Sequence, residues 1–520
     1  MFVITALVCF STVFAQKSNI ELKVLGSYAA GAYNQGASEI VAYDPRTLRL
    51  FTVNGATSKI DVLSLANPSA PTLLFSIELA AYGRQANSVD VRDGIVAAAV
   101  EANVKTDDGK VVFFDTDGNY LNAVTVGALP DMLTFTADGR KVLVANEGEP
   151  NNDYTVDPEG SVSIVDISGG AANATAKTAG FSAFNNAALD SSIRIFGPKA
   201  TVAQDLEPEY ITVSPDSETA WVTLQENNAV GILDLQSGEF TKLVGLGFKN
   251  HNLAGNGLDA SDRDNAVNIR NWQVFGMHQP DGIASFQVGN ETFLITANEG
   301  DAREYTGTPG YLEEVRVRPL TLDPTIFPNA ASLQIEANLG RLGVSRATGN
   351  FDGDGDYDAL YAFGARSFSI WTANVQQVYD SGDQIEQITA QAFPLFFNAS
   401  NSNNTRDDRS DNKGPEPEGV TVGKAYGRNY AFIGLERIGG ILVYDLTNPR
   451  LPQFVQYINN RNFLAATNTR AAGDLGPEGL HFIDAEDSPT GTPLLIVANE
   501  VSGTTTVYQI TQGRNKRSLR

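Results

Sequence analysis

The sequence predicts an all-β protein, a β-propeller with long loop insertions, and three observations carry this prediction. Short runs rich in Val, Ile, Thr, Tyr and Phe recur, and Gly (48) and Pro (22) are frequent between them, as in strands joined by turns. Long amphipathic helical patterns are scarce. A similar segment also returns at a period of about 40 residues, as the four-stranded blades of a propeller do.

Each repeat has the same order of parts: an acidic turn, an apolar strand, a turn, a second apolar strand, a polar loop and a third strand. Six repeats are continuous and occupy residues 38–65, 87–115, 130–167, 208–235, 417–446 and 477–510. A seventh begins at 280 with "PDGIASFQVGNETFLITANEGD", but its third strand, "RSFSIWTAN", comes only at 366–374. We therefore expect seven blades, with an insertion of roughly sixty residues inside one of them.

The repeats follow one another without linkers. Several separate β-sandwiches would need linkers at their boundaries, so we expect one propeller domain over residues 16–512. The longest irregular stretches are predicted to be surface loops, and they occupy residues 168–206, 245–278, 302–350 and 394–414.

The two ends of the sequence differ from the repeats. Residues 1–15, "MFVITALVCFSTVFA", are apolar but too short to span a bilayer comfortably. Small residues at Val13 and Ala15 predict a signal peptide cut before Gln16, although a basic n-region is missing; the alternative is a buried N-terminal strand. Residues 513–520 form a basic tail. No second apolar stretch of about 18 residues occurs, so we expect a secreted protein with no membrane span.

Secretion has consequences for cysteine and for glycans. The single cysteine, Cys9, lies in the predicted signal peptide, so the mature chain would have no disulfide. Asn-x-Ser/Thr sequons, which would carry N-linked glycans in a eukaryotic cell, occur at Asn173, Asn290, Asn398 and Asn403.

The chain is strongly acidic, with a formal net charge of −24. This balance excludes nucleic acid as an expected partner, because phosphate binding needs a basic surface. It suits calcium ions, a calcium mineral surface or other matrix proteins with basic surfaces. The alternative is that the charge serves solubility alone.

Acidic residues recur at fixed places in the repeats, as in "ANEGEPNNDYTVDPEGS" at 145–161. In a propeller blade the first strand begins, and the second strand ends, at the same mouth of the central channel. Carboxylates at both places should therefore form a ring, which like-charge repulsion makes costly unless a cation neutralises it. Calcium, with its preference for oxygen ligands, fits best. The alternative is that Pro-Glu-Gly serves only as turn chemistry.

The predicted ring draws on both kinds of position. Strand starts supply Asp131, Glu209, Asp281, Glu418 and Glu478, and second-strand ends supply Glu101, Glu147, Glu226, Glu299, Glu436 and Glu500. From these we predict the metal ligands Glu147, Glu209, Asp281, Glu299, Glu418, Glu436, Glu478 and Glu500.

A second acidic motif is "NFDGDGDYDALYAFG" at 350–364. Asp352, Asp354, Asp356 and Asp358 alternate as at positions 1, 3, 5 and 7 of a calcium loop. The motif is not an EF-hand, because Tyr357 stands where Gly is expected. We predict a calcium loop, with a solvated acidic turn as the alternative.

Catalytic motifs are sparse, and no catalytic residue can be assigned. His251, His278 and His481 are too scattered for a zinc motif, and no nucleophile elbow or P-loop occurs. His278 and His481 lie near strand starts, where they are either catalytic or simply packed. Arg303 and Arg366 could hold a phosphate, but partners for nearby carboxylates are the simpler interpretation.

The stretches "LVANEGEPNNDYTVDPEGSVSIVDI", "LITANEGDAREY", "FDGDGDYDALYAFGARSFSIW" and "EPEGV" resemble the choice-of-anchor I domain proteins and their animal relatives, the mesenchyme-specific cell surface glycoproteins. The similarity runs over roughly residues 20–512. It implies a propeller and a secreted or cell-surface glycoprotein, which in animals is linked to calcified skeletons and shells. Some bacterial relatives are labelled phosphatase-like or phytase-like esterases.

Two hypotheses follow. The first is a non-enzymatic, secreted, acidic calcium-binding glycoprotein of an extracellular, mineralised matrix. The second is a calcium-dependent phosphoesterase, in which clustered carboxylates hold metals that activate water and clamp a phosphate. We favour the first, and both depend on calcium as the bound ion.

Overall fold

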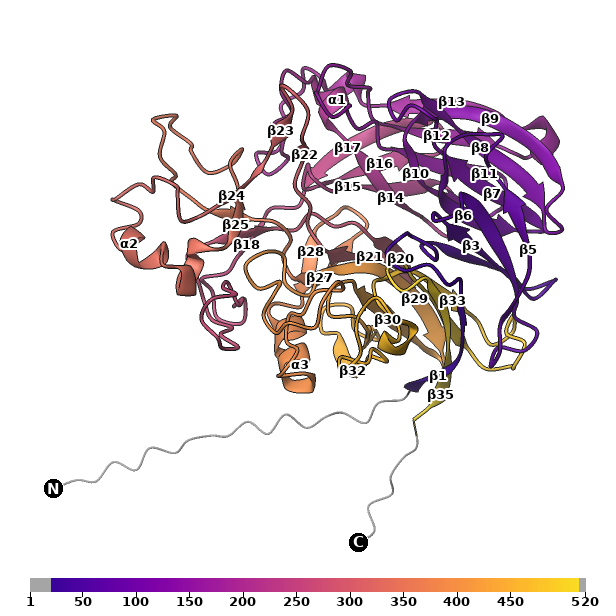
Figure 1. Ribbon diagram of the computed structural model, residues 1–520. Coiled ribbons are helices and arrows are strands. Elements are labelled where there is room, and N and C mark those ends of the chain that lie inside the picture. The colour runs from indigo at the N-terminus through magenta and orange to yellow at the C-terminus, as the bar shows by residue number, and fades with distance from the viewer. Residues whose placement is uncertain (1–19, 514–520) are drawn as a thin grey trace, which may run out of the picture.

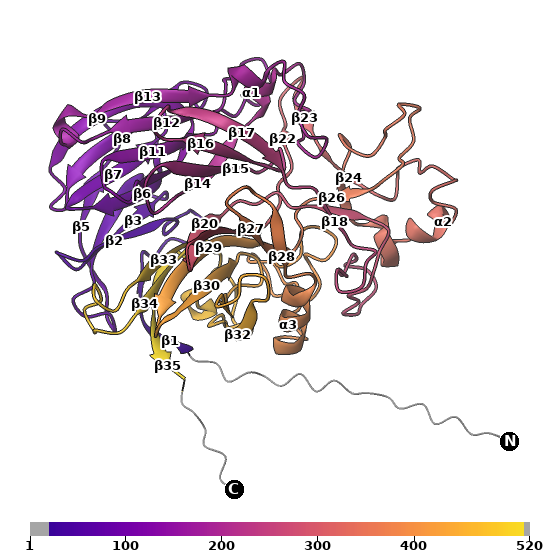
Figure 2. The ribbon, with the colours of Figure 1, turned by 180° about the vertical axis from the view of Figure 1, so that it is seen from behind.

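A computed structural model describes residues 20–513, and within that range the chain folds into seven four-stranded antiparallel sheets set around an axis (Figures 1 and 2). The first strands of the sheets contact one another in the closed order β2, β6, β10, β14, β20, β29, β33 and back to β2. Sheets arranged radially in this way form a β-propeller, as the sequence predicts. The predicted signal peptide, and all but Gly513 of the predicted basic tail, lie outside the described residues.

Each sheet has four strands, which are numbered first to fourth outward from the axis. The first strands are β2 (Val41–Asp44), β6 (Ala86–Arg92), β10 (Pro130–Phe135), β14 (Pro208–Val213), β20 (Ile283–Val288), β29 (Pro417–Ala425) and β33 (Pro477–Ile483). The second strands are β3 (Arg49–Asn54), β7 (Ile95–Val100), β11 (Lys141–Asn146), β15 (Thr219–Leu224), β21 (Glu291–Asn298), β30 (Arg428–Leu435) and β34 (Leu494–Asn499).

The outer layers continue the same order. The third strands are β4 (Lys59–Ser64), β8 (Asp108–Asp115), β12 (Ser161–Asp166), β16 (Ala229–Asp234), β27 (Ser367–Thr372), β31 (Ile441–Asp445) and β35 (Thr504–Gln512). The fourth strands are β5 (Thr72–Glu78), β9 (Tyr120–Ala128), β13 (Thr175–Gly180), β17 (Glu239–Gly245), β28 (Gln377–Asp380), β32 (Gln453–Ile458) and β1 (Ile20–Ala29).

The ring is closed by the two ends of the described chain. Strand β1 pairs antiparallel with β35, with Ile20 opposite Gln512 and Ala29 opposite Thr504. The N-terminal strand thus completes the sheet made by the last three strands, so the two ends of the described chain lie side by side (Figure 1).

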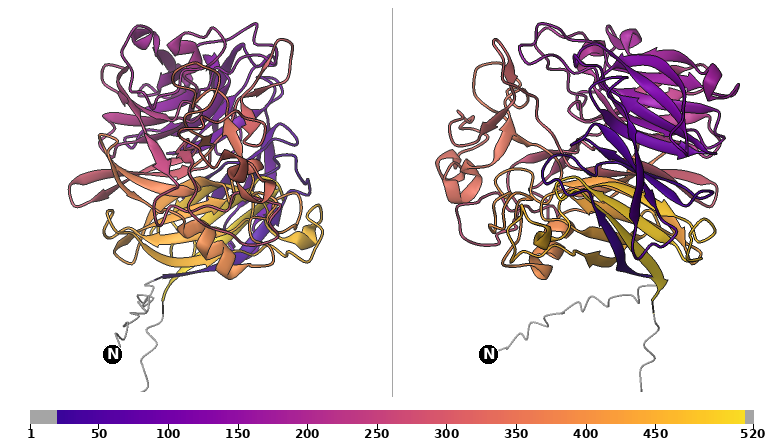
Figure 3. Two further views of the ribbon diagram at one scale, coloured as in Figure 1. Left: turned by 90° about the vertical axis from the view of Figure 1, so that its left-hand side faces the viewer. Right: turned by 45° about the vertical axis from the view of Figure 1, so that its right-hand side comes forward.

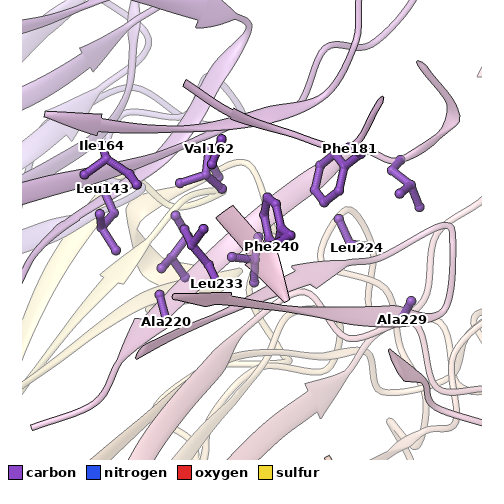
Figure 4. Close-up of a cluster of buried hydrophobic side chains, with 14 of the residues drawn as sticks. Leu143, Val162, Ile164, Phe181, Ala220, Leu224, Ala229, Leu233 and Phe240 are labelled. Atoms are coloured by element: carbon purple, nitrogen blue, oxygen red, sulfur yellow. The ribbon is translucent and has the colours of Figure 1, made fainter. Parts of the chain in front are cut away.

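Burial explains why some strands are clear in the sequence and others are not. Second and third strands such as β11 and β31 are buried along nearly their whole length, because neighbouring sheets cover both of their faces. Fourth strands such as β13 are mostly exposed. Between two sheets, Leu143, Ile164, Leu224 and Leu233 fill one core, and Phe240 stacks on Phe181 with ring centroids 4.3 Å apart (Figure 4).

The predicted insertion is confirmed. Strand β21 pairs with β27 as its third-strand neighbour, so "RSFSIWTAN" returns to the sheet after the insertion. The intervening chain contributes to a lobe beside the propeller (Figures 1 and 3). Its sheet contains β18 (Phe248–Asn250), β19 (Phe275–Met277), β26 (Tyr361–Ala362), β25 (Gly343–Ser345) and β24 (Glu314–Arg316), and a separate hairpin pairs β22 (Glu304–Tyr305) with β23 (Tyr311–Leu312).

Helices are short in the described range. They are α1 (Val202–Asp205), α2 (Ala330–Leu333) and α3 (Gln384–Ala392), with 3-10 turns at Ala171–Asn173, Ser182–Phe184 and Arg470–Ala472 and a π-turn at Glu336–Gly340. Over residues 20–513, no helix has the length and hydrophobicity that a bilayer crossing requires.

Candidate metal centre

Strand pairing brings the repeated carboxylates to one mouth of the channel. Pro130 at the start of β10 lies opposite Asn146 at the end of β11, so Asp131 and Glu147 sit at the same edge of their sheet. The pairing of Pro477 with Asn499 does the same for the last sheet. We call the residues at these two places, one pair from each sheet, the carboxylate ring.

The ring has acidic residues at most of its positions. At or just before the first strands stand Glu39, Asn87, Asp131, Glu209, Asp281, Glu418 and Glu478, and directly after the second strands stand Gly55, Glu101, Glu147, Gln225, Glu299, Glu436 and Glu500. Glu226 follows Gln225.

The first cluster joins two ring residues, Glu147 and Glu209, to Glu226 next to the ring, and one carboxylate oxygen of each lies within 4.8 Å of the other two. Glu226 is buried, and its Oε2 has no hydrogen-bond partner among the described residues. Burial, followed by repulsion from neighbouring carboxylates, raises the pKa of Glu147 and of Glu209 well above its usual value. Three convergent oxygens with one unpaired are a donor set for a hard cation.

A second cluster joins Asp281, Glu299 and Glu418 within the same 4.8 Å limit. The Oε2 of Glu418 is buried and accepts no hydrogen bond from any residue in the described range. Glu299 is already contacted, because Lys413 Nζ lies 2.7 Å from its Oε1 and Gln225 Nε2 lies 2.9 Å from its Oε2. This cluster therefore has fewer free oxygens than the first.

A third cluster, Glu299, Glu416 and Glu436, is neutralised by the chain itself. Glu416 accepts from Arg409 at 2.6 Å and from Arg437 at 2.9 Å, and Lys413 lies 3.2 Å away. Burial alone would raise the pKa of Glu416, but Lys413, Arg437 and Arg409 hold it well below its usual range. Glu436, predicted as a metal ligand, is paired with Arg437 at 2.8 Å. These basic residues offset negative charge on this side of the mouth, although burial, followed by repulsion from Glu416, still raises the pKa of Glu436 well above its usual value.

The last part of the ring contains a residue that sequence reasoning missed. Burial, with repulsion from Glu500, Asp131 and Glu101, raises the pKa of Glu39 to about 8. Glu39 precedes β2 without a neighbouring proline, so the Pro-Glu pattern did not reveal it. Glu39 occupies the acidic position at the start of the first repeat, "SEIVAYD", and that position could have identified it as a ring residue. Glu478 beside it has a buried Oε2 to which nothing within residues 20–513 donates a hydrogen bond.

A cavity of about 320 Å³ opens beside the first and third clusters. Acidic and basic side chains both line it, among them Glu149, Glu226, Asp301, Arg303, Arg409, Lys413 and Arg437. The cavity therefore combines carboxylates with cations, a lining suited to a small, highly polar ligand.

The acidic loop at 350–364 is only partly assembled as predicted. Asp356 and Asp358 lie within 4.8 Å of a third carboxylate, Asp323, which no sequence spacing could reveal. Tyr357 N donates to Thr321 O at 3.0 Å, and this contact aligns the two segments. Asp352 and Asp354 are exposed and stand outside this group.

The other candidate residues have structural roles. Arg303 is buried and paired with Asp205 and Glu207, and Arg366 pairs with Glu386 at 2.8 Å, so both are carboxylate partners as the simpler interpretation predicts. His278 is buried and His481 is half-buried. Desolvation lowers the pKa of each, to about 4 for His481, so both are neutral packed residues at pH 7.

The asparagines of the four sequons differ in their exposure to solvent. Asn173 and Asn290 are exposed, and Asn403 is half-buried. A glycan predicted on Asn398 is incompatible with this fold, because its Nδ2 is buried and donates to Glu386 at 2.9 Å and to Ser410 at 2.9 Å. The surrounding segment 394–414, predicted to be a surface loop, buries Asp407 as well.

The chain is similar to one protein family and to two named proteins. The family model of the choice-of-anchor I domain matches residues 39–449. Gigasin-3a of Magallana gigas is 32% identical over 191 residues, which cover 34% of this chain and 67% of gigasin-3a. The mesenchyme-specific cell surface glycoprotein of Strongylocentrotus purpuratus is 28% identical over 278 residues, 47% of this chain, and this chain spans only 35% of its length.

Solved structures with a similar arrangement are distant in sequence. A chain of Kuenenia stuttgartiensis hydrazine synthase is 12% identical with a TM-score of 0.47, covering 92% of this chain and 98% of its own length. A streptogramin B lyase is 10% identical with a TM-score of 0.46, covering 95% and 98%.

Proposed function

Because the chain belongs to the choice-of-anchor I domain family, we propose that it is a secreted, acidic, calcium-binding glycoprotein of an extracellular, mineralised matrix. The observation that carries this proposal is the cluster of Glu147, Glu209 and Glu226, which has converging oxygens and no basic partner among the described ion pairs. Calcium takes six to eight oxygen ligands in flexible geometry, and a bound ion would offset the repulsion in the cluster.

The extracellular setting is supported by three features. One relative is named a cell surface glycoprotein. Asn173 and Asn290 are exposed and able to carry glycans. The net charge of −24 favours calcium ions or a calcium mineral surface as partners. The mineralised matrix itself comes from the resemblance of the motifs to skeleton-associated proteins.

Thermal melting of the purified chain in calcium, in magnesium and in chelator tests the proposal. A ligand that binds only the folded state at about 100 times its dissociation constant adds about 2.7 kcal/mol, so calcium should raise the midpoint clearly. Magnesium should raise it less, because magnesium demands a tighter octahedral site. Equal midpoints in calcium and in chelator would contradict the proposal.

A calcium-dependent phosphoesterase is the second candidate, and the cavity favours it. Glu226 belongs both to the first cluster and to the cavity wall, where Lys413 and Arg437 also lie. A metal held by the cluster would face a space in which these cations could contact a phosphate. Release of phosphate from an aryl phosphate, lost in chelator and in Glu147→Gln, is the expected behaviour of such an enzyme. No turnover in calcium, magnesium, manganese or zinc would remove this candidate.

A further inference from the structure

Two irregular segments outside the ring bring three more carboxylates together. Asp259 and Asp264 come from the segment before β19, and Asp407 comes from the segment before β29. Their ligand oxygens lie within 4.8 Å of one another. None of the three belongs to the carboxylate ring or to the 350–364 loop, and about 140 residues of chain separate the two segments.

This group is buried on one side and open on the other. Asp259 is 0% exposed and Asp407 is 3% exposed, whereas Asp264 is partly exposed. Buried like charges at this separation repel strongly, because little water screens them. The exposed side at Asp264 gives an ion a route to the group.

No described ion pair includes Asp259, Asp264 or Asp407, although the charge of Arg406 acts on Asp407 from a greater distance. Arg366 Nη1 donates to the carbonyl oxygen of Asp259 at 2.6 Å and to the carboxylate of Glu386 at 2.8 Å. Its Nη2 donates to the carbonyls of Ser410 at 2.8 Å and Asn412 at 2.6 Å. Arg406 donates to the carbonyl and to Oδ1 of Asn265, both at 2.7 Å, so its guanidinium joins the two segments without pairing with a carboxylate.

Two buried oxygens, one in the group and one on a nearby amide, have no hydrogen-bond partner among the described residues. Asp407 accepts from Ser410 Oγ through Oδ1 at 2.5 Å, but its Oδ2 is buried and has no hydrogen-bond partner among the described residues. Asn398 Oδ1 is in the same condition, because its Nδ2 is fixed by Glu386 and Ser410. Burying an oxygen without a hydrogen-bond partner costs free energy, and a bound cation would offset that cost.

We propose that Asp259, Asp264 and Asp407 form a calcium site that fastens segment 259–268 to segment 398–411. The three carboxylates supply the charge. Asn398 Nδ2 donates to Ser410 Oγ, which donates to Asp407, so this amide is held beside Asp407 and its Oδ1 is the neutral oxygen ligand that we propose. Carboxylate and amide oxygens from irregular loops are the ligand set that calcium favours over magnesium. The site would act as a structural clip, and it does not depend on calcium binding at the ring.

The test combines a count of bound calcium with hydrogen exchange on the full mature chain. Native mass spectrometry should show that Asp407→Asn and Asp264→Asn each bind one calcium fewer than the unchanged protein. Calcium should slow amide exchange in 259–268 and in 398–411 together, at least tenfold, and both variants should lose this slowing. Asp264→Asn covers the case in which Asp407→Asn fails to fold, because Asp264 is partly exposed.

Asp408→Asn is the matched control. Asp408 is the next residue in the chain but accepts from Asn403 at 2.9 Å, so its replacement should leave the calcium count and the exchange pattern unchanged. The proposal is overturned if Asp407→Asn and Asp264→Asn keep the full calcium count, or if calcium leaves exchange in both segments unaltered. Glu147→Gln distinguishes the two sites. Loss of calcium binding at the carboxylate ring should leave calcium binding by Asp259, Asp264 and Asp407 unchanged.

Discussion

The backbone N–H of Gly479 donates a hydrogen bond of 3.0 Å to the carbonyl oxygen of Glu39, and so joins the last sheet to the first at the channel mouth. A Cβ on Gly479 would lie 2.3 Å from that oxygen. The same close approach recurs where Gly419 meets the Glu478 carbonyl and where Gly282 meets the Glu418 carbonyl. The glycine of Pro-acidic-Gly therefore lets neighbouring acidic residues approach around the axis.

Gly419→Ala tests this account of the motif. The new Cβ would lie 1.9 Å from the Glu478 carbonyl oxygen, a backbone atom, so the first strands must separate. We expect a loss of about 1–3 kcal/mol in the free energy of unfolding, measured by denaturant titration. Gly180→Ala is the control, because no atom of the described part of the chain lies within 4 Å of a Cβ added there. Equal stability of the two variants would refute the packing role of Gly419.

The stability of the calcium-free protein should fall as pH rises. Burial first, then neighbouring carboxylates, raises the pKa of Asp131 to about 7 and that of Glu39 to about 8. In the unfolded chain these groups titrate near about pH 4, so the folded state binds more protons between these values. The stability they contribute is complete below about pH 4 and is lost as pH rises through about 7 to 8.

Melting in chelator from acidic to mildly alkaline pH measures this effect. The midpoint should drop across neutrality in chelator and stay level with calcium bound, because the ion replaces the protons. A midpoint that rises with pH in chelator would show that the ring carboxylates are already stabilised as anions.

Removing charge from the first cluster should stabilise the calcium-free protein. Glu147→Gln combined with Glu209→Gln removes two of three repelling carboxylates. In chelator at pH 7 we expect the free energy of unfolding to rise by about 1 kcal/mol or more, since one pKa unit corresponds to about 1.36 kcal/mol. Glu159→Gln, at an exposed position in the same stretch, should change nothing. Destabilisation by the double variant in chelator would argue for plain turn chemistry.

Arg303 should be a major contributor to stability. It is 0% exposed as a side chain and is paired with Asp205 and Glu207, both equally buried. Arg303→Met would leave two buried carboxylates uncompensated, so we expect a loss of about 3–5 kcal/mol in denaturant titration. Arg46→Met, which breaks an exposed pair with Asp93, should cost at most about 1 kcal/mol. Similar losses in both variants would contradict the expectation that the buried ion pairs of Arg303 contribute more to stability than the exposed pair of Arg46.

The repeats could be predicted from the sequence because the second and third strands are buried on both faces and appear as apolar runs. Strand β34, "LLIVAN", is an example. Fourth strands such as β5 are largely exposed and carry no such signal. The start of each repeat was visible where proline preceded the acidic residue, and Glu39 was missed because no proline marks it.

The site could be predicted only as far as strand order determines it. Glu147 and Glu209 meet because they occupy fixed places in successive repeats. Asp323 meets Asp356, and Asp259 meets Asp407, through the packing of irregular segments that have no repeat to align. Asn398 could not be placed from the sequence either. The polar composition of its segment predicted an exposed loop, but the Asn398 side chain is buried.

Calcium binding at the first cluster is the central claim, and equilibrium dialysis of calcium at about pH 7 tests it most directly. The unchanged protein and Glu159→Gln should bind the same number of calcium ions, and Glu147→Gln with Glu209→Gln should bind fewer. Equal binding by all three proteins would contradict calcium binding at the first cluster and would leave Glu147 and Glu209 as turn residues.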